Sequence, residues 1–153
     1  VVENCNMSIN LNSDHSVGIG AIGGVQNTHI YRSNIYIDGA GSFVTGIGGH
    51  NYSAGRIRIL HSEIDVKANG QVVELFGTPG GELEAELEKV TMSLRGEGSD
   101  VLGFGTRDKK MKASIRDSEV DINIHAAKFL LLAAETENVV QENTSIILRA
   151  NED

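Results

Sequence analysis

Several residue types that usually guide an interpretation are scarce in this sequence of 153 residues. It has one cysteine, one proline and no tryptophan, and aromatic residues make up 5% of the chain. A single cysteine, Cys5, cannot form an internal disulfide, and we expect it to be a small buried side chain. No apolar run reaches the length of about 18 residues that a membrane-spanning helix needs. The sequence therefore predicts neither an internal disulfide nor a membrane span.

Basic residues are also few. Lysine and arginine total 13 against 21 aspartate and glutamate residues, which gives a net charge of −8. A nucleic-acid surface needs clustered cations that neutralise phosphates, so we expect no nucleic-acid partner. Cationic or neutral polar partners remain compatible with this charge. Hydrophobic residues make up 40% of the chain, which is too many for a disordered polymer.

The chain has the length of one domain. We expect residues 1–153 to form a single β-solenoid domain excised from a longer protein, because the sequence begins with Val1 and not with methionine. No leader sequence is visible, but in an excised piece its absence does not indicate a compartment.

A triplet that is mostly small-hydrophobic-small, such as Gly-Ile-Gly, returns five times along the chain. Its central residues are Ile19, Ile47, Phe76, Phe104 and Leu132, so the steps are 28, 29, 28 and 28 residues. A constant period in this range is typical of stacked repeats, in which each unit buries its apolar side only against its neighbours.

Each repeat contains three short apolar segments. The first alternates polar and apolar residues, as in 56–59 and 82–87, and this period of two predicts a strand. A small polar residue such as Ser33 or Ser62 follows, and we expect the chain to bend there. A second strand comes next, then a turn rich in glycine and asparagine, then the triplet as a third strand. We also assign strand to 126–134, against its helical propensity, because it aligns with the triplet.

Three short strands per repeat, of about three to six residues each and with no helix between them, predict an all-β fold. The predicted architecture is a right-handed, single-stranded parallel β-helix of about five coils, each of roughly 28 residues. Coils would then be spaced by about 4.8 Å, the distance between paired strands.

Charge gives an independent test of this register. Residues one period apart should lie side by side, which places Arg56, Glu84 and Lys112 in one outward row. Opposite charges directly across neighbouring strands are favourable, and here their signs alternate. Two further outward rows and two apolar rows are expected: Arg58, Glu86 and Ser114; Leu60, Glu88 and Arg116; Ile19, Ile47, Phe76, Phe104 and Leu132; Ile9, Ile37, Val66, Leu94 and Ile122.

The Ile-x-Ile strands, the serine bends and the Gly-Ile-Gly triplets resemble the right-handed parallel β-helix superfamily, which includes pectate lyases, polygalacturonases and bacterial surface modules. The resemblance covers nearly the whole chain, but it is one of architecture, and a fold does not fix a function. Polygalacturonase-like enzymes carry an adjacent Asp pair and a Gly-His-Gly motif. Here no two aspartates are adjacent, and His50 stands in Gly48-Gly49-His50-Asn51.

Four residues are the candidates for ligand binding: Tyr31, Tyr36, Asp65 and Asp121. The two tyrosines should point outward, where a flat ring can contact a sugar. Asp65 and Asp121 should stack with Ser93 between them, about 9–10 Å apart at two strand spacings. That separation is too long for shared calcium coordination and is close to that of inverting glycosidase pairs.

No catalytic residue, metal site or cofactor is predicted. The histidines have no metal-ligand spacing to one another or to Cys5, and no helix follows the Gly-Ile-Gly triplets, as a phosphate loop would require.

Three functions stay open. The favoured one is a non-catalytic module of a larger bacterial protein that binds polysaccharide or forms a rigid surface scaffold, with an extracellular or cell-surface location. The alternatives are a fragment of a polysaccharide lyase or glycoside hydrolase, and a self-association or sensor domain of an intracellular regulator. Expected partners are polysaccharide, a neighbouring domain at the N-terminal coil, and a homo-oligomer formed end to end or face to face, because coil ends expose strand edges.

Overall fold

The computed structural model describes residues 1–22, 24–50 and 54–152, and it contains strands but no helix over these ranges. The strands are β1 (Val2–Glu3), β2 (Asn6–Asn12), β3 (His15–Ile22), β4 (Val25–Tyr31), β5 (Asn34–His50), β6 (Ala54–Leu60), β7 (Glu63–Gly77), β8 (Leu83–Glu88), β9 (Thr91–Gly105), β10 (Lys110–Arg116), β11 (Glu119–Ala133), β12 (Thr136–Glu142) and β13 (Ser145–Asn151).

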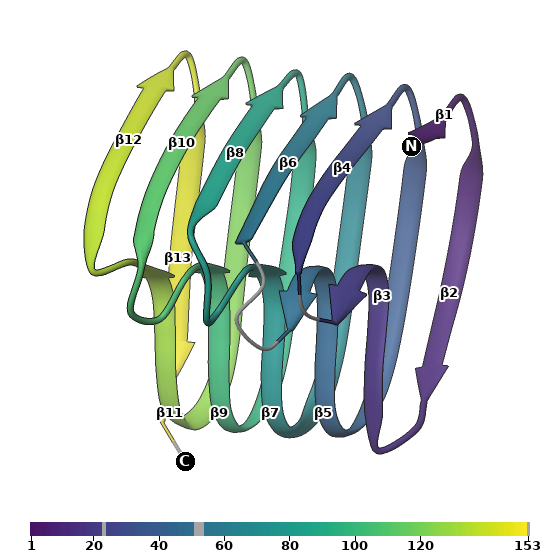
Figure 1. The fold of residues 1–153 in the computed structure, drawn as a ribbon, viewed down its shortest axis with the longest axis vertical. Coiled ribbons are helices and arrows are strands. Elements are labelled where there is room, and N and C mark those ends of the chain that lie inside the picture. The colour runs from purple at the N-terminus through teal and green to yellow at the C-terminus, as the bar shows by residue number, and fades with distance from the viewer. Residues whose placement is uncertain (23, 51–53, 153) are drawn as a thin grey trace.

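The strands form two sheets, which we call ladders, and the described strand pairings in both are parallel. One ladder has the order β1-β4-β6-β8-β10-β12, and the other has the order β13-β11-β9-β7-β5-β2, with β3 also paired to β5 (Figure 1). The chain alternates between the two ladders and advances one strand at each turn, so the termini lie at opposite ends of the stack. The predicted right-handed parallel β-helix of about five coils is confirmed.

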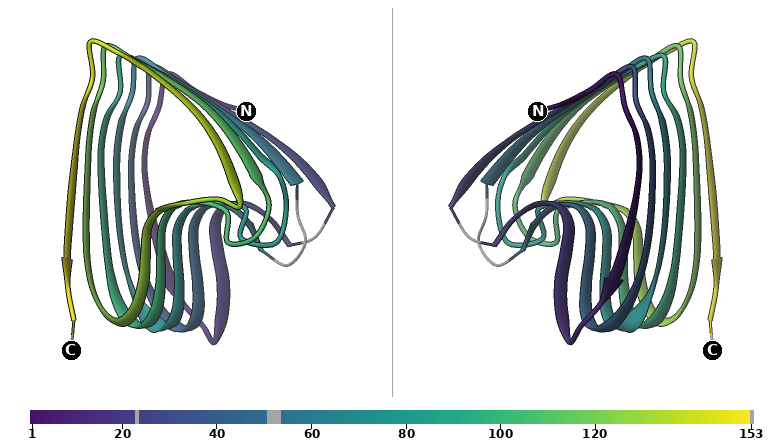
Figure 2. Two further views of the ribbon diagram at one scale, coloured as in Figure 1. Left: turned by 90° about the vertical axis from the view of Figure 1, so that its left-hand side faces the viewer. Right: turned by 90° about the vertical axis from the view of Figure 1, so that its right-hand side faces the viewer.

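The second and third predicted strands of each central coil run on as one long strand. They form β5, β7, β9 and β11, which are 15 to 17 residues long and bend in the middle, as the end-on views of Figure 2 show. Gly41, Gly70 and Gly98 stack at this bend. A Cβ atom on Gly70 would lie 2.3 Å from the carbonyl oxygen of Gly41, so the close approach of the backbones requires glycine.

The corner between the two ladders has a repeated backbone conformation. Its first residue lies in the left-handed region in each coil, with φ between 46° and 53°, at Asn4, Arg32, His61, Lys89, Asp117 and Asn143. The next residue is the predicted small polar bend residue. The hydroxyl of Ser118 donates to the Arg116 carbonyl (2.7 Å) and accepts the backbone N–H of Val90 in the preceding coil (3.1 Å). Serine at this position therefore links two coils.

Buried apolar rows run along the axis between the ladders. Ile47, Phe76 and Phe104 are register neighbours with at most 1% exposure, and the rings of Phe76 and Phe104 stack with centroids 4.5 Å apart. The second predicted row, through Ile37, Val66 and the matching residues of the next coils, is confirmed by the same pairings. Each buried side chain contributes about 1.5–3 kcal/mol of transfer free energy, so these rows stabilise the stack.

The facing rows of the core are complementary in size. Some of the triplets begin with a glycine that faces a large side chain. A Cβ atom added to Gly103 would lie 2.8 Å from the side chain of Ile122, and one added to Gly46 would lie 2.5 Å from the side chain of Val66. In the coil whose triplet begins with Leu75, that side chain instead packs over Gly96. Large residues thus face small ones, as close packing requires.

Replacing Ser118 with alanine should destabilise the protein. It leaves the buried N–H of Val90 without its acceptor, which costs about 1–3 kcal/mol. Urea unfolding of Ser118→Ala, followed by circular dichroism, should show a lower midpoint.

Val90→Thr is the matched stabilising variant. Corner hydroxyls of successive coils form a row, the hydroxyl ladder, and Val90 interrupts it between Ser62 and Ser118. Its new hydroxyl can accept the N–H of Ser62, and we expect a gain of about 0.5–1.5 kcal/mol. Equal midpoints for the alanine variant and the parent chain would contradict the linking role of the serine.

Candidate functional site

A shallow groove lies on the outer surface of the β4-β6-β8-β10-β12 ladder. Its volume is about 650 Å³, and it crosses the N-terminal ends of these five strands. The lining residues are Val25, Asn27, Ala54, Gly55, Arg56, Glu82, Leu83, Glu84, Lys110, Met111, Lys112, Glu137 and Asn138. We call it the outer groove.

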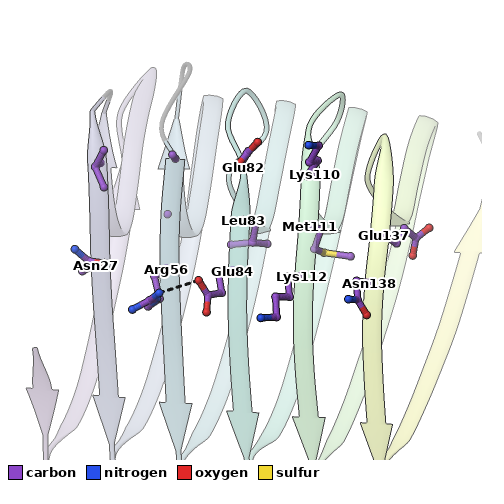
Figure 3. A pocket seen from close by; sticks show the side chains of 13 residues that line it. Asn27, Arg56, Glu82, Leu83, Glu84, Lys110, Met111, Lys112, Glu137 and Asn138 are labelled. Atoms are coloured by element: carbon purple, nitrogen blue, oxygen red, sulfur yellow. Dashed lines mark hydrogen bonds and ion pairs between the residues drawn. The ribbon is translucent and has the colours of Figure 1, made fainter.

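A single row of side chains projects along the outer groove, one from each coil: Asn27, Arg56, Glu84, Lys112 and Asn138 (Figure 3). The row follows from the period of two, because the neighbouring positions, such as Leu83 and Met111, turn inward and are 2% exposed. The parallel register then brings equivalent outward positions of successive coils side by side.

The predicted charge rows are confirmed in this groove and beside it. Arg56 and Glu84 form an ion pair at 2.9 Å, and in the adjacent row Arg58 and Glu86 form one at 3.0 Å. All four side chains are largely solvent-exposed, so each pair contributes less than about 1 kcal/mol. The pairs therefore favour the register and leave most of the stability to the core.

Lys112 is a cation of the groove row that has no carboxylate partner among the described residues. The row therefore presents a free ammonium group flanked by the carboxylate of Glu84 and the amide of Asn138, with the amide of Asn27 at the opposite end. These groups are hydrogen-bond donors and acceptors spread over five coils.

The register of the third predicted outward row is confirmed. Leu60, Glu88 and Arg116 are neighbours, yet the guanidinium group of Arg116 points to Glu142 in the following coil, at 3.8 Å.

Three of the four predicted ligand-binding residues lie on the outer surface of the other ladder. Tyr36, Asp65 and Asp121 belong to one outward row, in which Tyr36 pairs with Asp65, and Ser93 stands between the two aspartates as predicted. Tyr36 and Asp65 also line a hollow of about 380 Å³. Tyr36 is 40% exposed between the buried Ile35 and Ile37, which confirms its outward orientation.

Both aspartates of this row are already engaged by arginines. Arg149 donates to the two carboxylate oxygens of Asp121 at 2.8 and 3.0 Å, and Arg95 lies 3.8 Å from Asp65. The carboxylates of both aspartates are therefore occupied by ion pairs.

Tyr36 is held by a neighbouring carboxylate. Its hydroxyl donates a hydrogen bond to Asp38 Oδ2 at 3.3 Å. The negative charge of Asp38 is the main cause that raises the pKa of Tyr36 above its ordinary value, with desolvation as a second cause.

Tyr31, the fourth predicted residue, lies apart from the others, at the C-terminal end of β4 beside the corner. It is half-buried, its ring packs edge-on against His61 with centroids 5.8 Å apart, and the guanidinium carbon of Arg32 lies 4.8 Å from its ring centroid. The four predicted residues therefore do not form one site.

Sequence reasoning missed the outer groove, although it identified three residues of its central row. The step from Asn27 to Arg56 is 29 residues, so the period could have located Asn27. The step from Lys112 to Asn138 is only 26 residues, so a period of 28 leads to Val140 instead and could not have located Asn138. The side chain of His50 and all of Tyr52 lie outside the described residues. Within the described part of the chain, no cluster of three or more His, Cys, Asp or Glu side chains could hold a metal ion.

Comparison with known proteins gave no match: no family model, no curated protein and no solved structure is significantly similar to this chain. The fold and the surface together define a parallel β-solenoid with a shallow groove across its coils. A helix able to cross a membrane is absent from residues 1–22, 24–50 and 54–152.

Asp38→Asn should lower the pKa of Tyr36 towards the ordinary tyrosine value, because it removes the charge that disfavours the phenolate. The tyrosinate absorbance, followed by alkaline titration in a Tyr31→Phe/Tyr52→Phe background, reports this group alone. Asp108→Asn, an exposed site elsewhere on the chain, is the control and should leave the titration unchanged. An unshifted curve for Asp38→Asn would show that Asp38 does not control this tyrosine.

Proposed function

We propose that this chain is a non-catalytic β-solenoid module of a larger bacterial protein and that it binds polysaccharide along the outer groove. The observation that carries the proposal is the row of Asn27, Arg56, Glu84, Lys112 and Asn138, which supplies polar side chains from successive coils along one line. A linear polymer with regularly repeated hydroxyl groups suits a surface whose hydrogen-bonding groups repeat every 4.8 Å or so.

The shape and charge of the outer groove also suit the binding of a polysaccharide without catalysis. It is shallow and open, and opposite charges in it neutralise each other, as in the pair of Arg56 and Glu84. The aspartates that first indicated catalysis lie on the other ladder and are ion-paired. A lyase or hydrolase fragment is therefore the less supported interpretation.

The proposal extends to relationship and location. The stacked coils and the Gly-Ile-Gly triplets favour a place among pectate-lyase-like β-helix modules, and such modules occur at bacterial surfaces. An extracellular or cell-surface location would make polysaccharide an accessible ligand.

The groove proposal predicts the effect of an Asn27→Ala/Asn138→Ala variant. Each amide hydrogen bond to a sugar hydroxyl is worth about 0.5–1.5 kcal/mol, so the two changes should weaken binding by about tenfold. Affinity electrophoresis through a panel of soluble neutral and acidic polysaccharides would identify a ligand and measure the loss.

Asn10→Ala/Asn123→Ala is the matched control, since both asparagines are exposed on the other ladder. It should bind as the parent chain does. The proposal fails if no polysaccharide retards the protein, or if the control loses as much affinity as the groove variant.

A second candidate function, self-association, is favoured by the C-terminal coil. Leu148 continues a row that is buried in the central coils, yet it is 43% exposed. A second copy or a neighbouring domain stacked on this coil would cover it. Light scattering over a range of concentrations should show association that Leu148→Asn reduces, and a monomer at every concentration would remove this candidate.

A further inference from the structure

Two corners between the ladders carry a cationic side chain, although the left-handed backbone conformation of the corner favours asparagine or aspartate. Asparagine and aspartate adopt positive φ most readily among residues with a side chain, and Asn4, Asp117 and Asn143 follow this preference. Arg32 and Lys89 occupy the same position with φ of 46° and 53°. Long basic side chains gain nothing from this conformation, so another requirement must account for them.

Three of these corners stack directly on one another. The backbone N–H groups of these residues donate to backbone carbonyl oxygens of the next coil: Arg32 to Leu60, His61 to Glu88, and Lys89 to Arg116. Successive corners are therefore one coil apart. Arg32, His61 and Lys89 therefore form a line of exposed basic side chains with a spacing of about 4.8 Å. We call this line the corner ridge.

Arg32 also differs from the other arginines of the described chain in its pairing. All other arginines of the described chain form ion pairs with carboxylates: Arg56, Arg58, Arg95, Arg107, Arg116 and Arg149. Neither Arg32 nor Lys89 forms one with any described residue, although Glu88 directly precedes Lys89 in the sequence. Their charges stay available to a ligand.

Tyr31 fixes one end of the corner ridge. The guanidinium carbon of Arg32 lies 4.8 Å from the centroid of the Tyr31 ring, and the ring of His61 packs against the same tyrosine. This cation–π contact holds the planar group in place and leaves its edge free to donate paired hydrogen bonds. The arrangement suits an oxyanion such as a carboxylate or a sulfate ester.

We infer that the corner ridge binds the anionic groups of an acidic polysaccharide, an inference that rests on the proposed polysaccharide binding. A polymerised sugar ring advances its chain by a distance comparable to one coil, so acidic groups on neighbouring rings can meet successive corners. Asp117 ends the basic line, and the net charge is −8, so the ridge matches two or three acidic sugars and not a long polyanion.

Three polymers of the same backbone test the inference: dextran, carboxymethyl dextran and dextran sulfate of matched length. The variant Arg32→Asn/Lys89→Asn removes two cations and introduces the residue that already occupies this corner at Asn4 and Asn143, so the fold is preserved. Lys67→Asn/Lys109→Asn removes the same charge elsewhere on the surface and is the control.

The parent chain should bind one or both anionic dextrans more tightly than dextran, and more weakly as salt is raised. The corner variant should lose about tenfold or more of that affinity, and the control should stay within about twofold. A preference for carboxymethyl dextran or for dextran sulfate would identify the anionic group.

The inference is overturned if the corner variant binds the anionic dextrans as the parent does, if the control loses as much, or if neither anionic dextran is preferred. The outer groove is tested separately in each of these cases, because its asparagine variant is measured on whichever neutral or acidic polysaccharide of the panel is bound. Absence of binding to every polymer would overturn both proposals.

Discussion

Parallel backbone pairing in one continuous register is the interaction on which the rest of this protein depends. Ile37 pairs with Val66 and Val66 with Leu94, and the same alignment places Arg56 beside Glu84 on the opposite surface. A slip of one residue would turn the apolar rows outward and the charged rows inward. Register is therefore held from both sides, by burial within the core and by attraction outside it, and the hydroxyl ladder of the corner reinforces it.

The periodic part of this structure could be predicted from the sequence, because in a solenoid one alignment fixes every neighbour. The steps between Ile47, Phe76 and Phe104 were sufficient to place the core and the charged rows. The fusion of two predicted strands into β7 could not be predicted, because it depends on backbone hydrogen bonds that continue through the bend at Gly70. The left-handed corner was also hidden, since Arg32 and Lys89 are not residues that indicate positive φ.

The candidate sites were less predictable for a related reason. The row of Asp65, Ser93 and Asp121 followed from the period, but the ion pairs with Arg95 and Arg149 join residues that are diagonal neighbours across strands, and side-chain direction decides such contacts. Tyr31 was found, but its role as a support for Arg32 depends on the corner geometry. The sequence period thus identifies which residues share a row, but it does not identify the diagonal ion pairs that side chains form between rows.

The glycine column at the bend limits how the number of coils in such a chain can change. At Gly98 as at Gly70, the space for a Cβ atom is taken by the carbonyl of the coil before it. The following coil carries the buried Ala126 in this column, so a coil inserted between Gly70 and Gly98 would need a residue no larger than alanine at that height. Duplication of a whole repeat satisfies this condition automatically, whereas a segment from an unrelated strand does not. We therefore expect such a chain to lengthen mainly by duplication of whole repeats.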